Sequence, residues 1–374
     1  LKALLPVTET QAGMLFQHQH MENDPYIIQW HLSVSGDFNV QYFIQAYKHV
    51  IQNTDELKVT FHRQSNDVML SMVNHEVEIE IHQLEWQGDY ADAQLKIKAL
   101  LDSDRKRGFD LFNTCPIRAY IISRGYHQYE LLISHHHVLL DGWSFSSLLK
   151  EFNRIYQLIE NGESSREVTG KSSYQHYLTT RNKMNTHDAK YFWKEYLSGC
   201  QEQTILPMVK QHCVSSNTQT PFEHILLNLS ESLNRQLKTF CQNHQMTMAN
   251  VFQTAWGLML AYYTGYESVI FGTVVSGRNI PGGDWRETLG LLIQTVPMIL
   301  EVHAESSLMN ILKQVKESAP IIEKHSHIGL REITALSQIH QRDSLINSLI
   351  VIENHPLSHL GQVHEKWMID RLEC

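Results

Sequence analysis

The sequence predicts a mixed α/β protein built from two lobes. Segments with the alternation of strands and segments with the periodicity of helices follow one another along the chain, as in α/β architectures. The chain has 374 residues, more than one small hydrophobic core accommodates, so two lobes of ordinary domain size are expected. We place the lobes at residues 1–170 and 171–374 and expect each to pack helices on strands.

The elements of the first half follow from their apolar residues. In chain order we expect a helix at 42–52, strands at 117–123 and 129–134, and a helix at 145–159. A turn around Gly125 separates the two strands. The second helix should end at Asn161-Gly162, because glycine accommodates the left-handed conformation of a helix cap. Residues 162–173 are polar and form the candidate linker between the halves.

The second half repeats this alternation. We expect helices at 188–197 and 248–263 and strands at 268–275, 291–302 and 344–352. The helix at 248–263 is aromatic-rich, and we interpret its apolar stripe as core rather than as a ligand site. Thr264-Gly265 leads from this helix into the strand at 268–275.

Composition narrows the possible functions. The net charge is −9, from 31 basic and 40 acidic residues, and the basic residues are scattered, which argues against a nucleic-acid surface. No apolar run approaches the ~18 residues of a membrane span. Five cysteines, an odd number without a C-x-x-C pair, favour free thiols in a reducing cytoplasm. The N-terminal residues 1–6 lack an initiator methionine and a signal-peptide pattern, so we interpret the chain as a segment of a longer polypeptide.

The most informative motif is a run of three histidines at a strand end, followed by an Asp-Gly turn at Asp141. Histidine is the side chain best suited to moving protons near neutral pH. Strand alternation would place His135 and His137 on one side and His136 on the other. His136, His137 and Asp141 offer three metal ligands, but zinc enzymes more often set two histidines one helical turn apart, so we expect no metal.

The pattern His-His-x-x-x-Asp-Gly at 136–142 resembles the core motif of the acyltransferases that include nonribosomal peptide synthetase condensation domains. Six further regions are similar to motifs of that family and follow in the same order: 8–16, 55–61, 174–177 with 191–193 and 197–199, 271–278, 290–297 and 351–356. The chain departs from the family's usual residues at Lys58, Val59, Gln294 and Ile299. Together, the matching regions extend over nearly the whole chain.

The resemblance implies a fold and a reaction. The fold is two chloramphenicol acetyltransferase-like lobes that form a V-shaped pseudo-dimer, here with a C-terminal lobe that stops short of the family's usual length. The reaction is peptide bond formation between a donor acyl or peptidyl thioester and an acceptor aminoacyl thioester. Both substrates would ride on phosphopantetheine arms in a channel between the lobes, with no cofactor bound by the domain itself. The implied partners are the upstream and downstream peptidyl carrier proteins and an adjacent adenylation domain.

The same resemblance assigns site residues around the histidine motif. His137 is the residue implied to act on the substrate, either as a general base or as a group that positions the amine. His136, Asp141, Gly142 and Trp143 would support it, with His136 facing the interior and Asp141 ion-paired inside the lobe. Gly142-Trp143-Ser144 resembles the bond-forming branch of the family rather than its epimerisation domains.

A second group of site residues lies at 276–278. Ser276, Gly277 and Arg278 would form a channel or structural turn at the end of the strand at 268–275. Arg278 would pair with Asp141 or line the channel floor, and an ordinary surface arginine at a turn is the alternative.

Two other functions remain open. One is a domain of the same fold that lost catalysis and only recruits carrier or partner proteins. The other is a free-standing acyltransferase that uses coenzyme A thioesters. The intact His137, Asp141 and Gly142 argue against the first, and adjacent carrier and adenylation sequences would argue against the second.

Overall fold

The computed structural model describes residues 1–21, 23–64, 68–86, 90–163, 173–200, 202–207, 225–339, 344–353 and 366–373. The chain forms two compact units, and neither is continuous in sequence. Unit 1 contains Leu1–Lys183, Ile280–Ile293 and Glu353–Cys374, and unit 2 contains Met184–Asn279 and Gln294–Ile352. The units therefore do not follow the single boundary at residue 170, because two later segments return to unit 1.

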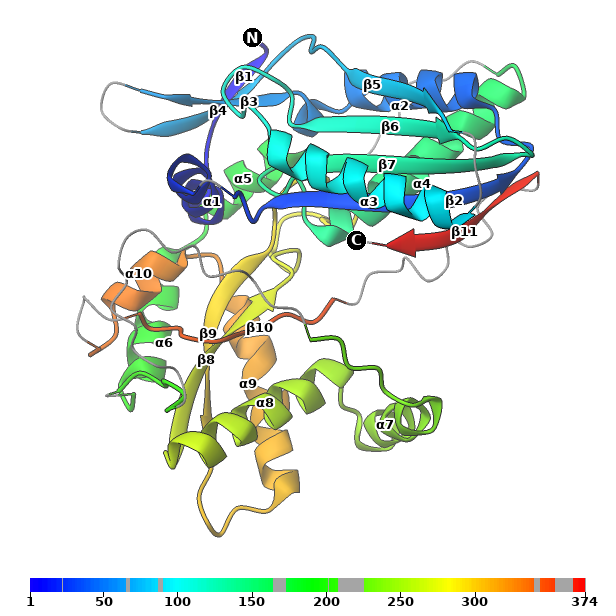
Figure 1. Cartoon of the computed structure of the whole chain (residues 1–374). Helices are drawn as coiled ribbons and strands as arrows, with labels where there is room; N and C mark the ends of the chain where they lie inside the picture. Colours follow the sequence, from blue (N-terminus) through cyan, green and yellow to red (C-terminus); the bar gives the residue numbers. More distant parts are fainter. Residues whose placement is uncertain are drawn as a thin grey trace. The chain divides into compact units, whose positions relative to one another are not determined.

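Unit 1 is organised around a five-stranded sheet (Figure 1). Its order is β11-β2-β7-β6-β5, with bounds Trp367–Glu373, Ile27–Gly36, Gln128–His136, Ile117–Ser123 and Glu80–Glu85. All neighbours are antiparallel except β5 and β6. The central strand β7 carries the histidine motif at its C-terminal end, so its pairing on both sides determines where that motif begins.

Helices cover both faces of this sheet (Figure 1). On one face lie α2, Val40–Asn53, and α4, Gly142–Glu160, which pack against each other. On the other face lies α3, Tyr90–Arg107, whose Leu100 and Leu101 pack against Tyr120 and Leu132 of the sheet. The central strands are thus covered on both sides, in agreement with the continuous burial of residues 117–122 in β6 and 130–136 in β7.

The rest of unit 1 is a small sheet with short helices beside it. Its strands are ordered β1-β4-β3, with bounds Ala3–Pro6, Met69–Val73 and Val59–Arg63. The helical elements are α1 at Glu9–His20, the 3₁₀ helix η1 at Asp55–Leu57 and α5 at Tyr174–Asn182. Thr8 and Gln11 form a capping box that begins α1, as a polar residue pair at this spacing predicts.

Unit 2 contains a three-stranded sheet and five helices in its described part (Figure 1). The sheet is ordered β10-β8-β9, with bounds Leu349–Ile350, Ser268–Val275 and Gln294–Glu301. The helices are α6 at Thr186–Leu197, α7 at Glu231–His244, α8 at Met248–Thr264, α9 at Leu308–Lys324 and α10 at Leu330–Ala335. Helices α8 and α9 pack on β8 and β9 around a core that includes Trp193, Phe271 and Leu300.

Most predicted elements are confirmed, and the differences have local causes. The strand expected at 291–302 begins only at Gln294, because the main chain of Leu291 and Leu292 bonds to side chains instead of a neighbouring strand. The strand expected at 344–352 is limited to β10, which has two residues. Gly162 has a φ of +69° after the end of α4, as predicted, and most of the proposed linker lies outside the described residues.

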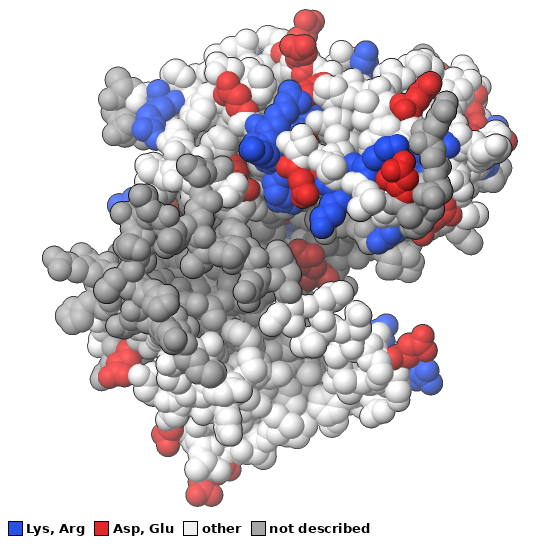
Figure 2. All heavy atoms as spheres, viewed as in Figure 1, with Lys and Arg blue, Asp and Glu red and all other residues white. Residues whose placement is uncertain are grey.

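Surface charge and hydropathy do not narrow the possible functions further. On the face shown in Figure 2, basic and acidic side chains are intermingled over unit 1. Among the residues that the structure describes, none of the helices combines the length and apolar character that a membrane crossing requires.

Candidate functional site

The histidine motif leaves the sheet between its second and third members. His135 and His136 are the last residues of β7, and their Cα partners in β2 are Ile28 and Ile27. At the next residue, the backbone N–H of His137 donates to the carbonyl of Tyr26 at 2.8 Å. This bond falls at the next step of the β2–β7 register, and the shared side of His135 and His137 remains a prediction.

His135 is a core residue. Its ring stacks on Phe145, with centroids 5.6 Å apart, and Phe145 stacks on Trp30 at 4.2 Å. Burial lowers the pKa of His135 well below its ordinary value, and the neighbouring His137 and His136 lower it further. The imidazole is therefore neutral at physiological pH, and its position between sheet and helix is structural.

His136 is fully buried and uses both ring nitrogens. Its Nε2 lies 2.9 Å from Oδ2 of Asp24, and its Nδ1 accepts a hydrogen bond from the backbone N–H of Val138 at 3.0 Å. Burial lowers the pKa of His136, although the hydrogen bond to Asp24 opposes this shift. The prediction that His136 faces the interior agrees with this geometry.

His137 differs from both neighbours. Its side chain is half-buried, whereas those of His135 and His136 are buried. Its Nδ1 atom is buried and has no hydrogen-bond partner within the described part of the chain, and the same holds for Nδ1 of His135. The partial exposure of its side chain therefore distinguishes His137 from His135 and His136.

Asp141 anchors the turn that follows the histidines. It is the N-cap of α4, where its Oδ1 accepts from the backbone N–H of Ser144 at 2.9 Å. Its Oδ2 accepts from the backbone N–H of Leu292 at 3.0 Å. Gly142 is therefore the first residue of α4 and Trp143 the second, and the carboxylate of Asp141 holds the helix start against a distant segment of unit 1.

Gln11 holds the same turn from α1. Its Nε2 donates to the carbonyl of Val138 at 3.1 Å, while its Oε1 accepts from the backbone N–H of Thr8. The sequence placed Gln11 inside a family motif without predicting this contact. Through this contact, a glutamine in the first helix supports the histidine turn, although the two lie more than a hundred residues apart in the sequence.

Ser276, Gly277 and Arg278 form a turn in unit 2, directly after β8. The Ser276 hydroxyl donates to Oε1 of Glu323 at 3.1 Å and accepts from the backbone N–H of Arg278 at 3.2 Å. Gly277 has a φ of +67°, which favours glycine there. Arg278 is 6% exposed, which does not fit the alternative of a surface arginine. Its pairing with Asp141 remains a prediction.

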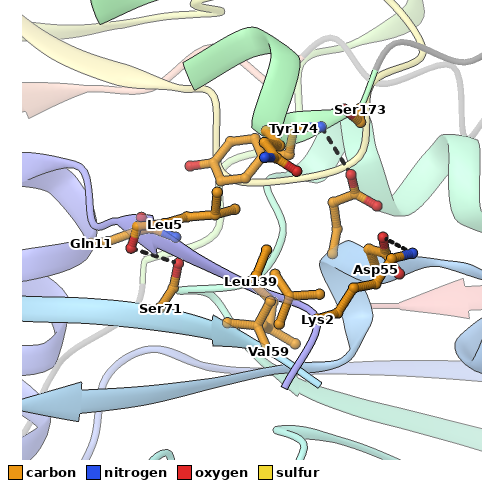
Figure 3. A pocket seen from close by; sticks show the side chains of 13 residues that line it. Lys2, Leu5, Gln11, Asp55, Val59, Ser71, Leu139, Ser173 and Tyr174 are labelled. Carbon is orange, nitrogen blue, oxygen red and sulfur yellow. Dashed lines mark hydrogen bonds and ion pairs between the residues drawn. The ribbon is translucent and has the colours of Figure 1, made fainter. Parts of the chain in front are cut away.

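Sequence reasoning did not find a small pocket beside the histidine turn (Figure 3). Its volume is about 230 Å³, and its wall includes Leu139 of the turn and Tyr174 of α5. At the rim, Lys2 pairs with Asp55 at 2.6 Å, and Glu56 accepts from the backbone N–H of Tyr174 at 2.9 Å.

The two acids of this pocket are shifted in opposite directions: the pKa of Asp55 is lowered and that of Glu56 is raised. Burial raises the pKa of Glu56, the hydrogen bonds from the backbone N–H groups of Tyr174 and Glu56 itself lower it, and the charge of Asp55 raises it again, for a net rise. The charged side chains at the rim are thus engaged with one another and with the backbone of Tyr174.

Sequence comparison identifies relatives of one kind. A model of the condensation domain family matches residues 2–373. Bacitracin synthase 3 of Bacillus licheniformis is 29% identical over 357 residues, which are 95% of this chain and 6% of that protein. Tyrocidine synthase 2 of Brevibacillus parabrevis is 28% identical over 356 residues, 94% of this chain and 10% of that protein. The chain thus spans only a small part of these curated relatives.

Structural comparison agrees with the fold. The first condensation domain of the calcium-dependent antibiotic synthetase, solved with a substrate analogue, matches with a TM-score of 0.76 at 15% identity. That match covers 94% of this chain and 80% of the other. A mutant of the starter condensation domain of rhizomide synthetase, solved with C8-CoA and Leu-SNAC, matches with a TM-score of 0.75 at 15% identity, covering 94% and 78%.

Proposed function

The chain belongs to the condensation domain family, and from that membership we propose that it joins two thioester substrates through an amide bond. The amine of an aminoacyl thioester attacks the carbonyl carbon of a donor acyl or peptidyl thioester. A C–N bond forms, the C–S bond breaks, and the donor thiol leaves with a proton that the amine has given up. Condensation domains are acyltransferases, and this step is an acyl transfer to nitrogen.

One observation carries the assignment of His137 to this step. It is the half-buried member of the three histidines, whereas the side chains of His135 and His136 are buried. His135 stacks on Phe145 in the core, and both nitrogens of His136 are engaged. We infer that His137 either accepts the proton of the attacking amine or orients that amine, and general base catalysis typically contributes ~10²–10⁴-fold.

The remaining site residues support His137. Asp141 and Gly142 begin α4 and hold the turn after the histidines, with Trp143 directly behind them. In unit 2, the turn at Ser276, Gly277 and Arg278 would line the path of the substrates. These roles are inferred from the resemblance of both segments to family motifs.

We further propose that both substrates are carried on phosphopantetheine arms of an upstream and a downstream peptidyl carrier protein. An adenylation domain in the same cytoplasmic polypeptide would load the acceptor. The curated relatives are peptide synthases many times longer than this chain. Tethering makes a bimolecular step effectively intramolecular, and well-oriented reactants of this kind gain ~7–11 kcal/mol.

The test is product formation on an acceptor carrier protein, followed by intact-protein mass spectrometry. The domain is used within its full-length module, together with a loaded donor carrier. We expect the acceptor to gain the donor acyl mass with the wild type and to lose at least ~100-fold of that rate with His137→Ala. His187→Ala is the matched control, because the His187 side chain is 87% exposed and distant in sequence from the motif.

The outcomes separate condensation from recruitment. Product from the wild type and the control, but not from a folded His137→Ala protein, supports the proposal. If a folded wild type forms no product with several donor and acceptor acyl groups, the condensation proposal is wrong and a recruitment domain of the same fold is favoured.

A further inference from the structure

A short segment before β2 contacts two of the three histidines, His136 and His137. The carboxylate of Asp24 receives three hydrogen bonds: Oδ2 accepts from Nε2 of His136 at 2.9 Å and from Nδ1 of His18 at 2.6 Å, and Oδ1 accepts from the backbone N–H of Tyr26 at 2.9 Å. Two residues later, the carbonyl of Tyr26 accepts from the backbone N–H of His137 at 2.8 Å. One segment therefore holds the side chain of His136 and the backbone of His137.

The charge of Asp24 determines which way these hydrogen bonds run. Burial raises the pKa of its carboxyl group, but the hydrogen bonds from His136, His18 and the backbone N–H of Tyr26 outweigh burial and hold it well below the usual range. An ionised carboxylate only accepts hydrogen bonds. Both Nε2 of His136 and Nδ1 of His18 must therefore carry a hydrogen atom.

This requirement fixes the tautomer of His136. A neutral imidazole with its hydrogen on Nε2 has a lone pair on Nδ1, and that lone pair accepts from Val138 N–H at 3.0 Å. The carbonyl of Val138 in turn accepts from the side chain of Gln11. A continuous chain of hydrogen bonds thus runs from Asp24 through His136 to Val138, and the turn that it holds contains His137.

A metal ion is the competing explanation for this cluster. Ligand atoms of His18, Asp24 and His136 all lie within 4.8 Å of one another, and two histidines with one carboxylate can bind zinc. Coordination through Nε2 of His136 would move its hydrogen atom to Nδ1. Two hydrogen atoms would then face each other between Nδ1 and Val138 N–H, so the observed bond favours the hydrogen-bonded chain over the metal.

We propose that Asp24 is a positioning residue for amide bond formation, because through His136 it holds the turn that presents His137. This inference rests on the proposed function of His137. It assigns Asp24 no contact with substrate, and it assigns His18 the secondary role of a second donor to the same carboxylate.

The experiment combines a spectroscopic measurement with kinetics. With ¹⁵N-labelled histidine rings, the shifts of Nδ1 and Nε2 report the tautomer, and the signals of His136 are assigned by their loss in His136→Gln. The wild type should show hydrogen on Nε2. In Asp24→Asn, the amide oxygen should keep the hydrogen bond from the backbone N–H of Tyr26, because that donor cannot move its hydrogen atom. The NH₂ group then faces Nε2 of His136, so the tautomer of His136 should change.

The expected effect on kinetics follows from a displacement of His137. Asp24→Asn should lower kcat by about tenfold to 100-fold and leave KM for both carrier substrates within about twofold, because the reacting groups are misplaced while binding surfaces remain. Asp37→Asn is the matched control, since that aspartate side chain is 73% exposed, and it should change neither kcat nor the His136 signals.

Three results overturn the proposal. One is hydrogen on Nδ1 of His136 in the wild type, which needs no variant to fold and no active enzyme. Another is a folded Asp24→Asn protein with unchanged kcat, or with reduced kcat but the wild-type tautomer. The third is a shift of the His18 and His136 signals by stoichiometric Zn²⁺ together with a change in activity. Absence of product from the wild type would contradict the proposed function separately, because the tautomer measurement does not depend on turnover.

Discussion

Ser144 and Gly290 exchange two hydrogen bonds across 146 positions of sequence. The hydroxyl of Ser144 donates to the carbonyl of Gly290 at 2.7 Å and accepts from its N–H at 3.1 Å. The backbone N–H of Asp141 donates to the same carbonyl, and the Asp141 carboxylate accepts from Leu292 N–H. The first turn of α4 is therefore joined to a segment from the second half of the chain, directly beside the histidine turn.

The first prediction concerns that exchange. Ser144→Ala should lower the free energy of unfolding by about 1–3 kcal/mol, because the buried N–H of Gly290 loses its acceptor. Ser146→Ala is a matched control in the same helix: Ser146 is equally buried, and its Oγ has no hydrogen-bond partner among the residues described. Urea unfolding of both variants measures the difference, and equal costs would contradict the assigned role of Ser144.

The second prediction concerns the conformation of Gly290. Its φ is +143°, and an added Cβ would lie 2.5 Å from the Tyr174 ring. Gly290→Ala should therefore destabilise unit 1 by about 2 kcal/mol or more, since both backbone strain and overpacking contribute. Gly125→Ala separates the two causes, because Gly125 has a φ of +76° with open space around it. Thermal unfolding should show the smaller shift for Gly125→Ala, and the reverse order would refute the steric argument.

The third prediction concerns the N-cap Asp141. Asp141→Ala removes the acceptor of two buried N–H groups, those of Ser144 and Leu292. Loss of a cap alone costs ~0.5–2 kcal/mol, and a second unsatisfied N–H raises the expected loss to about 2–4 kcal/mol. Asp141→Asn keeps one acceptor oxygen and should lose less. Chemical denaturation of both proteins tests this, and wild-type stability and activity in Asp141→Ala would rule out a structural role.

The fourth prediction concerns the stability of the fold in acid and depends on Asp104. This aspartate is 2% exposed and lies against β7, the strand that ends in the histidine motif. Burial raises the pKa of this carboxyl, but hydrogen bonds from Arg118 and Ser134, the charge of Arg118 and a hydrogen bond from Gln29 lower it on balance. A carboxyl with a depressed folded pKa stabilises the fold above its unfolded pKa of about 3.9, and this stabilisation is lost as pH falls through the folded pKa.

Asp104→Asn should consequently cost about 3–5 kcal/mol at pH 7, because Arg118 remains buried without its counter-ion. The variant should also show a weaker decline in unfolding free energy than the wild type between about pH 4 and pH 2. Asp37→Asn, at an exposed aspartate, should reproduce the wild-type pH dependence. Parallel curves for Asp104→Asn and the wild type would show that Asp104 contributes nothing to the acid response.

The fifth prediction concerns His135, whose pKa burial holds well below its ordinary value. The unfolded chain protonates near pH 6.5 while the folded ring stays neutral, so its contribution to stability is present above about pH 6.5 and is lost as pH falls toward the folded pKa. His135→Phe keeps the stack on Phe145 and removes the titrating group. Its unfolding free energy should fall less than that of the wild type between pH 6.5 and 5, and identical slopes would refute the prediction.

Local patterns in the sequence predicted most of the elements but few of the contacts in the site. The strand at 117–123 and the start of the helix at 248 agree with the structure to the residue, because periodic burial is visible in sequence. The apolar residues Leu291 and Leu292 look like strand residues and are not. Their main chain bonds to Asp141 and Tyr174, contacts that no local pattern records.

The same limit explains why Asp24 was not predicted. It lies 112 positions from His136, in a segment with no motif of its own, and an aspartate before Pro25 is an ordinary loop residue. The histidine motif itself was visible, because its spacing is preserved within one short stretch. The sequence therefore identified the residues that match a family pattern. The residues that hold these in place, such as Asp24, could be identified only from the structure.

The pairing of β11 with β2 has a consequence for biosynthesis. Glu373 lies opposite His31, so roughly 340 residues must be translated before this edge of the sheet is covered, which takes about 17–70 s at typical rates of synthesis. Until then β2 presents an open edge to other nascent chains, and exposed edges promote aggregation. We expect slow translation or early truncation to lower the soluble yield of the first unit even though its histidine strand is complete by residue 136.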